Sequence, residues 1–201
     1  MKKKRSRMMM GMLFLLLTLA LGVVPVQAAK RKAVKVQSKI TRSNGRMSMT
    51  VRGLDSKGKQ VWRHKTGKYP ATELTMVECV VRKQKVYIFA GSKLTVLRKT
   101  DGKKLWTVNN ISPAGYMLTF DKSDNLYVTG YYENIIFKIS RNGRILWKTD
   151  TSKTGNYWPN NLRVSGKKLI IPYGTSTNPP YNSSNHRVIL STKTGKIISY
   201  K

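Results

Sequence analysis

A short motif that occurs four times constrains the fold of this chain more than any other feature of the sequence. In each copy a glycine stands four residues before a tryptophan or its replacement, as in Thr100–Trp106. The other copies span residues 56–62, 141–147 and 193–199, and the last has Ser199 in place of tryptophan. Glycine supplies the positive φ of a tight hairpin turn, and the tryptophan follows on the next strand. A repeat of about 40 to 50 residues that carries several short strands is typical of β-propellers and related arrays.

Alternating or apolar runs between these motifs predict the strands. The predicted strands are 34–40, 47–51 and 60–64 in the first unit, 74–82, 86–89, 94–97 and 104–108 in the second, 116–120, 126–129, 135–139 and 145–148 in the third, and 161–164, 168–172, 187–190 and 197–200 in the fourth. We therefore expect an all-β fold, a propeller-type array of about four four-stranded antiparallel blades with an incomplete first blade. The expected blades cover about residues 33–66, 70–109, 112–150 and 157–201.

The first 28 residues have the pattern of a signal peptide. A basic head at residues 2–7 precedes an apolar run, Met8–Val24, and Val26-Gln27-Ala28 places small residues where a signal peptidase cleaves. We expect cleavage after Ala28, which leaves residues 29–201 as the propeller domain of an exported or envelope-associated protein. An uncleaved membrane anchor is the alternative, because the apolar run is close to membrane-spanning length.

The charge of the chain indicates anionic partners. The 39 Lys and Arg residues and eight acidic residues give a formal charge of +31, of which the signal peptide carries five. For an exported protein this favours cell-wall polymers, acidic polysaccharide or lipid headgroups over a specific nucleic-acid partner. The alternative is that the charge serves solubility alone.

A hydrophobic strand, a glycine and a second strand precede a segment with Asp-x-x-x-Gly-x-x-x-Trp-like spacing. This pattern resembles the pyrroloquinoline-quinone-like (PQQ-like) β-propeller repeat. Residues 86–106 and 126–147 carry the resemblance best. The family implies that Trp62, Trp106 and Trp147 dock between adjacent blades. The quinoprotein dehydrogenases of the family use paired cysteines and an acidic calcium site, whereas this chain has one cysteine and few acids. The resemblance therefore implies the fold and not redox activity, and we expect no cofactor.

In a blade of four antiparallel strands, the first-to-second and third-to-fourth turns lie on one side of the array. We call this side the turn face and the opposite side the loop face. The turn face is expected to be basic and to contact an anionic surface through Lys83, Lys85, Lys103, Lys104, Arg144, Lys167 and Lys168. The loop face is rich in aromatic residues that suit a protein or glycan ligand. The candidate ligand-binding residues are Tyr69, Tyr116, Tyr131, Tyr132, Trp158, Tyr173 and Tyr181; the alternative is that these rings fill gaps between blades.

Other reactive residues do not form a recognisable site. His64 and His186 are far apart in the predicted topology, Cys79 is expected to be a buried thiol, and Asp121 and Asp124 fit turn chemistry better than a calcium loop. We expect no catalytic or metal-binding residues. The sequence predicts a non-catalytic binding or scaffold module.

The sequence is compatible with two ways of closing the propeller. The first unit lacks its innermost strand, and the last strand leaves nothing to supply it. The chain either forms a compact four-bladed ring or is an array completed by a partner or by a second copy of itself. A partial propeller, related to quinoprotein enzymes with lost or partner-dependent activity, is the functional alternative.

Overall fold

The structure is a computed structural model that describes residues 31–71, 77–111, 117–129, 134–154, 157–159, 161–174 and 186–200. Within these ranges nearly all regular structure is β-strand, and the only helix is a single 3-10 turn, η1 (Ser152–Thr154). No helix of the described part is long and apolar enough to cross a bilayer. The predicted signal peptide, residues 1–28, lies outside the described residues.

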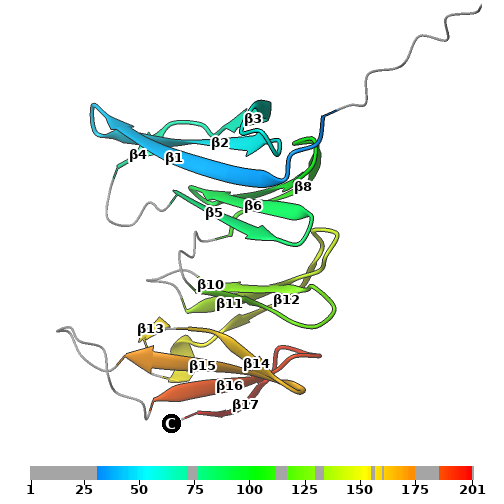
Figure 1. The fold of residues 1–201 in the computed structure, drawn as a ribbon. Helices are drawn as coiled ribbons and strands as arrows, with labels where there is room; N and C mark the ends of the chain where they lie inside the picture. The colour runs from blue at the N-terminus through cyan, green and yellow to red at the C-terminus, as the bar shows by residue number, and fades with distance from the viewer. Residues whose placement is uncertain are drawn as a thin grey trace, which may run out of the picture. The chain divides into compact units, whose positions relative to one another are not determined.

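The first sheet contains three long antiparallel strands in the order β1-β2-β3 (Figure 1). They are β1 (Lys35–Ser43), β2 (Arg46–Leu54) and β3 (Gln60–Lys65), and a short β4 (Tyr69–Pro70) pairs with the beginning of β2. The β1–β2 turn places Asn44 and Gly45 at φ values of 50° and 65°. This pair of positive φ angles is typical of the Asn-Gly hairpin predicted from the sequence.

The second and third sheets each contain four consecutive antiparallel strands. In the second sheet these are β5 (Val77–Arg82), β6 (Lys85–Ala90), β7 (Lys93–Arg98) and β8 (Lys104–Asn109). In the third sheet they are β9 (Leu118–Phe120), β10 (Leu126–Thr129), β11 (Ile135–Ile139) and β12 (Ile145–Asp150). Both agree with the predicted strand order.

The fourth sheet has a divided first strand. Its continuous strands are β15 (Lys168–Gly174), β16 (Arg187–Ser191) and β17 (Ile197–Tyr200), and both β13 (Tyr157–Pro159) and β14 (Arg163–Ser165) pair with β15. The expectation that residues 157–159 lie in a loop is wrong, because they form β13. Pro159 masks the strand pattern, because proline cannot donate to a ladder and is tolerated only at a sheet edge.

The propeller prediction is confirmed: four antiparallel sheets follow one another along the chain. Trp62, Trp106 and Trp147 lie on the last strand of their sheets, which are β3, β8 and β12. Two strands precede β3 in its sheet, whereas three precede β8 and three precede β12. The strand that the first sheet lacks is therefore the innermost one, and β4 does not replace it because it continues the line of β3 along β2.

The repeat also appears as a shared irregularity. The pairing between the last two strands of each sheet shifts once, between Gly53/Leu54, Val96/Leu97, Lys138/Ile139 and Ile189/Leu190. A β-bulge bends its strand and increases the local twist. Four equivalent bulges show that the sheets are copies of one structural unit.

Two clusters of buried apolar side chains form the core. The smaller joins the first and second sheets through residues such as Met49, Val51 and Ile88. The larger joins the second, third and fourth sheets and includes Phe89, Tyr127 and other fully buried residues. Burial of these sheet faces is the main stabilising term for such a stack.

Candidate functional site

Each motif tryptophan contacts the glycine of the next motif along the chain. A Cβ atom added to Gly102 would lie 2.7 Å from the indole of Trp62, and one added to Gly143 would lie 2.6 Å from that of Trp106. Trp147 is equally close to Gly195, at 2.8 Å. No side chain fits in this space, so the glycine allows the indole to lie on the backbone.

The indole nitrogen fixes the same contact through a hydrogen bond. Nε1 of Trp62 donates to the carbonyl of Lys99 at 2.8 Å. The corresponding bonds run from Trp106 to Arg141 at 3.1 Å and from Trp147 to Thr192 at 3.2 Å. An indole has an apolar ring system and one polar N–H. The ring can therefore pack on the glycine while the N–H donates a hydrogen bond to the turn.

Gly58, the glycine of the first motif, differs from the other three. It shares their turn conformation, with φ at +77°, but no atom of the described residues lies within 4 Å of a Cβ built on it. The fourth motif in turn has the small Ser199 where the others have tryptophan. The described array therefore contains three of these contacts, and both ends lack one.

Turns from neighbouring sheets meet on the turn face. The carboxylate of Asp124, in the β9–β10 turn, pairs with Arg82 at 3.0 Å and with Lys83 at 2.6 Å. Nζ of Lys85 donates to the carbonyl of Arg141 in the β11–β12 turn. Hydrogen bonding from Lys83 and Arg82 lowers the pKa of Asp124 below its usual value.

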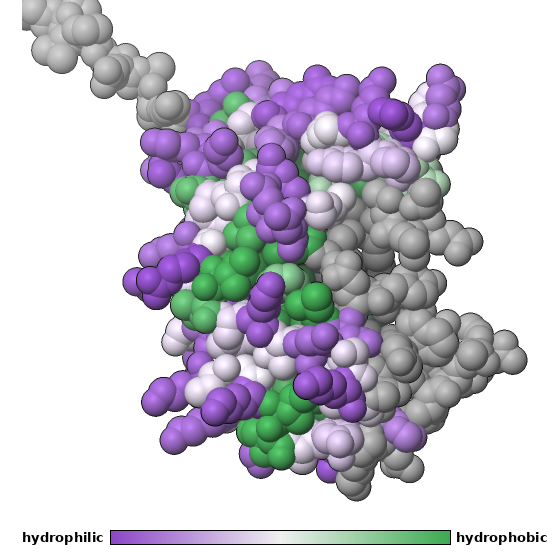
Figure 2. All heavy atoms as spheres, turned by 180° about the vertical axis from the view of Figure 1, so that it is seen from behind, coloured by the Kyte–Doolittle hydropathy of each residue, from purple (hydrophilic) through white to green (hydrophobic). Residues whose placement is uncertain are grey.

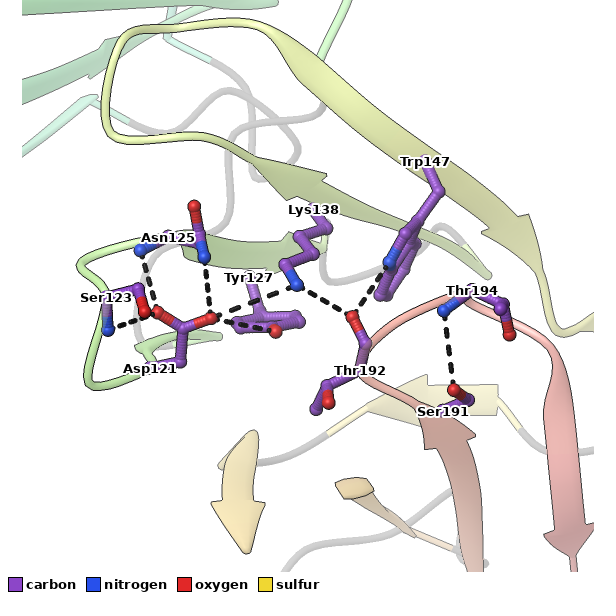
Figure 3. A network of polar contacts seen from close by, with 9 residues as sticks. All are labelled: Asp121, Ser123, Asn125, Tyr127, Lys138, Trp147, Ser191, Thr192 and Thr194. Atoms are coloured by element: carbon purple, nitrogen blue, oxygen red, sulfur yellow. Dashed lines mark hydrogen bonds and ion pairs between the residues drawn. The ribbon is translucent and has the colours of Figure 1, made fainter. Parts of the chain in front are cut away.

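Asp121 organises the β9–β10 turn of the third sheet (Figure 3). Its carboxylate accepts hydrogen bonds from the backbone N–H groups of Ser123 and Asn125 at 2.9 Å each, and from the Tyr127 hydroxyl at 3.1 Å. Burial tends to raise the pKa of Asp121, but hydrogen bonds from the side chain and the backbone N–H of Asn125 and from the Tyr127 hydroxyl outweigh it and lower the pKa. The carboxylate thus acts in turn chemistry, as the sequence analysis proposed.

Lys138 connects this turn to the fourth sheet. Its Nζ lies 3.9 Å from the Asp121 carboxylate and donates to the carbonyl of Thr192 at 2.7 Å. Thr192 is the carbonyl that also accepts from Trp147, so one backbone group holds two side chains of the third sheet (Figure 3). Sequence reasoning missed Lys138, because a lysine within an apolar strand gives no sign of its partner.

A shallow pocket of about 750 Å³ lies on the turn face of the third sheet. Its lining contains two cations, Arg141 and Arg144, together with serine and asparagine side chains and the apolar Leu146. None of the described lining residues is acidic. The pocket belongs to the basic face predicted from the sequence.

The predicted anion-contacting residues fall into two groups. Lys83 and Lys85 contact the third sheet, as described above; Lys83 remains exposed and Lys85 is half-buried. The remaining five are exposed and have no such contact described above: Lys103, Lys104, Arg144, Lys167 and Lys168. The exposed charge of this face therefore comes mainly from the third-to-fourth strand turns of the second and third sheets and from the β14–β15 turn.

The predicted aromatic residues do not form one described cluster. Tyr173 is only 1% exposed and its hydroxyl hydrogen-bonds Thr151 at 2.8 Å, so its side chain belongs to the core and not to a ligand surface. Burial raises the pKa of Tyr173 to about 12. Tyr69 is half-buried and packs against Gly91. Both follow the alternative in which loop rings fill gaps between sheets.

Four of the remaining candidates, Tyr116, Tyr131, Tyr132 and Tyr181, lie outside the described residues. For Trp158 the structure describes the backbone within β13 only.

The other reactive side chains are dispersed. Cys79 is half-buried on β5, and burial raises the pKa of its thiol to about 12, which disfavours the nucleophilic thiolate. Burial and the nearby charges of Lys93 and Lys104 lower the pKa of His64. Among the described residues no group of three or more His, Cys, Asp or Glu is placed to hold a metal ion.

Comparison with known proteins gives one family. The model of the family described as "Outer membrane protein assembly factor BamB" matches residues 25–199. No curated protein sequence matches the chain.

Solved structures share the fold at low sequence identity. BamB from Moraxella catarrhalis is 17% identical with a TM-score of 0.50, over 84% of this chain and 51% of that one. Hsv2 from Kluyveromyces marxianus is 11% identical with a TM-score of 0.51, over 81% and 48%. The chain thus spans about half the length of the BamB and Hsv2 structures.

Proposed function

Because the chain belongs to the BamB family of PQQ-like β-propellers, we propose that it is an exported, non-catalytic propeller module that binds a protein partner in the cell envelope. The family match over residues 25–199 is the observation that carries this proposal. Propellers also host enzymes, so the fold alone does not decide the function.

Five of the six described acidic residues, all except Glu78, are used in a way that supports a non-catalytic role. Asp55, Asp101, Asp121 and Asp150 accept hydrogen bonds from backbone N–H groups of their own turns. Asp124 joins two sheets. Carboxylates committed to turns and sheet contacts are poor candidates for general acid or base work, which needs a group directed at a substrate.

We assign partner binding to the loop face, through Tyr116, Tyr131, Tyr132, Trp158 and Tyr181. Aromatic side chains dominate protein-binding surfaces because they provide large contact area at low entropic cost. A glycan is the alternative ligand for the same rings.

The test is cross-linking in intact envelopes followed by identification of the captured protein, with Tyr132→Ala/Trp158→Ala as the variant. The double variant is expected to lose the captured partner while its melting temperature stays close to that of the unmodified protein. Tyr173→Phe is the control and should retain the partner. Capture of the same partner by the double variant, or collapse of its stability, would count against the loop face.

The turn face is assigned to an anionic surface of the envelope, through its exposed cations. Binding to vesicles that contain anionic lipid should weaken steeply as salt is raised, because screening and counterion release remove the attraction. Binding that is independent of salt would contradict this assignment.

A second copy of the chain, rather than a different partner, is an alternative means of completing the propeller. The exposed apolar side chains of the last sheet favour this alternative. Two apolar side chains there are exposed, Ile198 at 52% and Tyr200 at 58%. The mass in solution tests this: a dimer that dissociates on Ile198→Asp would support a second copy, and a monomer would support a closed four-bladed ring or completion by a different partner.

A further inference from the structure

The outward face of the first sheet carries exposed, charged side chains, unlike the sheet faces that pack in the core. In β2 the side chains of Met47, Met49 and Val51 are buried in the cluster shared with the second sheet. Side chains alternate along a strand, so Arg46, Thr50 and Arg52 lie on the opposite, outward face. We call this the outer face; it consists of the outward side chains of β1, β2 and β3.

Cations from all three strands lie side by side on the outer face. Arg52 pairs directly with Arg63, and Thr50 is flanked by Lys39 on one side and Lys65 on the other. All four cations are exposed. Figure 2 shows the surface over the first sheet as almost continuously hydrophilic.

Among the described residues of the first sheet, no carboxylate is free to balance this charge. Residues 35–70 contain one acid, Asp55. Its carboxylate accepts from the backbone of Lys57 and Lys59 and lies 3.3 Å from Arg31, so it is already engaged at the β2–β3 turn. The outer face therefore carries net positive charge with nothing within the sheet to neutralise it.

This arrangement costs stability. Like charges directly opposite each other on neighbouring strands are destabilising, and Arg52 and Arg63 occupy such a pair. The face also cannot pack against another sheet, because burial would strip water from unpaired cations. A bound anion is the simplest means by which both costs are offset.

A hollow on the outer face provides hydrogen-bond donors beside the cations. It has a volume of about 590 Å³ and is lined by Arg46, Arg63, Lys65 and Lys68 together with hydroxyl side chains that include Thr50. None of the described residues that line it is acidic. Arginine forks and hydroxyl groups together match the tetrahedral oxygens of phosphate.

We propose that the outer face of the first sheet binds an extended polymer that bears phosphate groups. Cations spread over three strands fit a chain of regularly spaced charges better than a single small anion. A polymer strand can enter the hollow, whereas a bilayer surface cannot. The two aromatic residues of the sheet, Trp62 and Tyr69, pack toward the second sheet, so the face has no ring on which nucleic-acid bases would stack.

The experiment uses fluorescently labelled inorganic polyphosphate and the full chain at about 0.1 M salt. The outer-face variant is Lys39→Gln/Arg52→Gln/Arg63→Gln/Lys65→Gln. The control is Lys93→Gln/Lys148→Gln/Lys153→Gln/Arg187→Gln, which removes the same charge at exposed positions of the second, third and fourth sheets that belong to neither the outer face nor the turn face. The outer-face variant is expected to bind at least about tenfold more weakly, with a shallower dependence of log Kd on log salt, because fewer counterions are released. The control is expected to change by less than about threefold.

Two results would overturn the proposal. One is equal loss in both variants, which would mean that net charge alone governs binding. The other is tighter, outer-face-dependent binding of anionic vesicles or of a single-stranded oligonucleotide than of polyphosphate. Circular dichroism and thermal melting check the fold, and the pair Lys39→Gln/Lys65→Gln repeats the test if the fourfold variant unfolds. Loss of vesicle binding on replacement of the turn-face cations Lys103, Lys104, Lys167 and Lys168 would concern the proposed function and not this site.

Discussion

The indole of Trp62 lies on the backbone of Gly102 and hydrogen-bonds the carbonyl three residues before it, at Lys99. The tryptophan of one motif therefore depends on the glycine of the next, more than 35 residues along the chain. This explains why the two residues recur together: the glycine serves its own turn and also receives the ring of the preceding sheet.

Gly102→Ala should therefore destabilise the protein more than Gly58→Ala. Both glycines have positive φ, at +70° and +77°, so both substitutions carry similar backbone strain of about 1 kcal/mol. Only Gly102 has an indole within 2.7 Å of the added Cβ, and overpacking adds about 1–3 kcal/mol. Urea denaturation of the two variants measures the difference. Equal losses would show that the Trp62 contact contributes nothing.

Asp121→Asn should lower the free energy of unfolding at pH 7 by about 1–2 kcal/mol, because the turn loses charge-assisted hydrogen bonds. The pKa of Asp121 is lowered in the folded protein, so its stabilising contribution is present above the ordinary value of 3.8 and is lost as the pH falls through the lowered value. The variant and the unmodified protein should thus converge in acid. Asp101→Asn, at a turn on the second sheet, is the comparison and should cost less. A gap that persists at low pH would contradict this account.

Glu78→Gln should instead raise the free energy of unfolding at pH 7. One carboxylate oxygen of Glu78 is buried without a hydrogen-bond partner among the described residues, and burial raises its pKa. A raised pKa means that ionisation destabilises the fold, so the penalty appears as the pH rises through the ordinary value of 4.5 and is absent below it. The variant should melt higher at pH 7, by about 1 kcal/mol of added stability, and equal the unmodified protein near pH 3. A lower melting temperature at pH 7 would mean that Glu78 has a bonding partner.

Tyr173→Phe should cost about 1 kcal/mol of stability, because the Thr151 hydroxyl loses its buried partner. Thermal melting measures this loss. Partner capture should be unaffected, since Tyr173 lies in the core. Lost capture with an unchanged melting temperature would instead place Tyr173 in the binding surface.

The architecture was predictable because it depends on local signals. Gly45 and Gly102 are needed at positive φ in tight turns, and the strands between such turns are long enough to show their periodicity. The short β4 and β13 escaped prediction because Pro70 and Pro159 resemble loop residues and only pairing with a distant strand makes them part of a sheet.

The candidate site was less predictable for a related reason. Tyr173 looked like a loop aromatic because it follows Pro172, yet β15 continues to Gly174 and carries the ring into the core. The outer face was overlooked because Lys39, Arg52 and Arg63 are separated in sequence and only strand register brings them together. Residue types can be read from the sequence, but the register between distant strands cannot, and this register determines which side chains lie together.

The contact between motif tryptophan and motif glycine is tested most directly by the proton chemical shifts of the glycines. An indole lying on a glycine shifts the Hα resonances upfield through its ring current. We expect strong upfield shifts for Gly102, Gly143 and Gly195, and ordinary values for Gly58, whose surroundings hold no ring within 4 Å among the described residues. Ordinary Hα shifts at all four glycines would contradict the stacking of tryptophan on glycine from sheet to sheet.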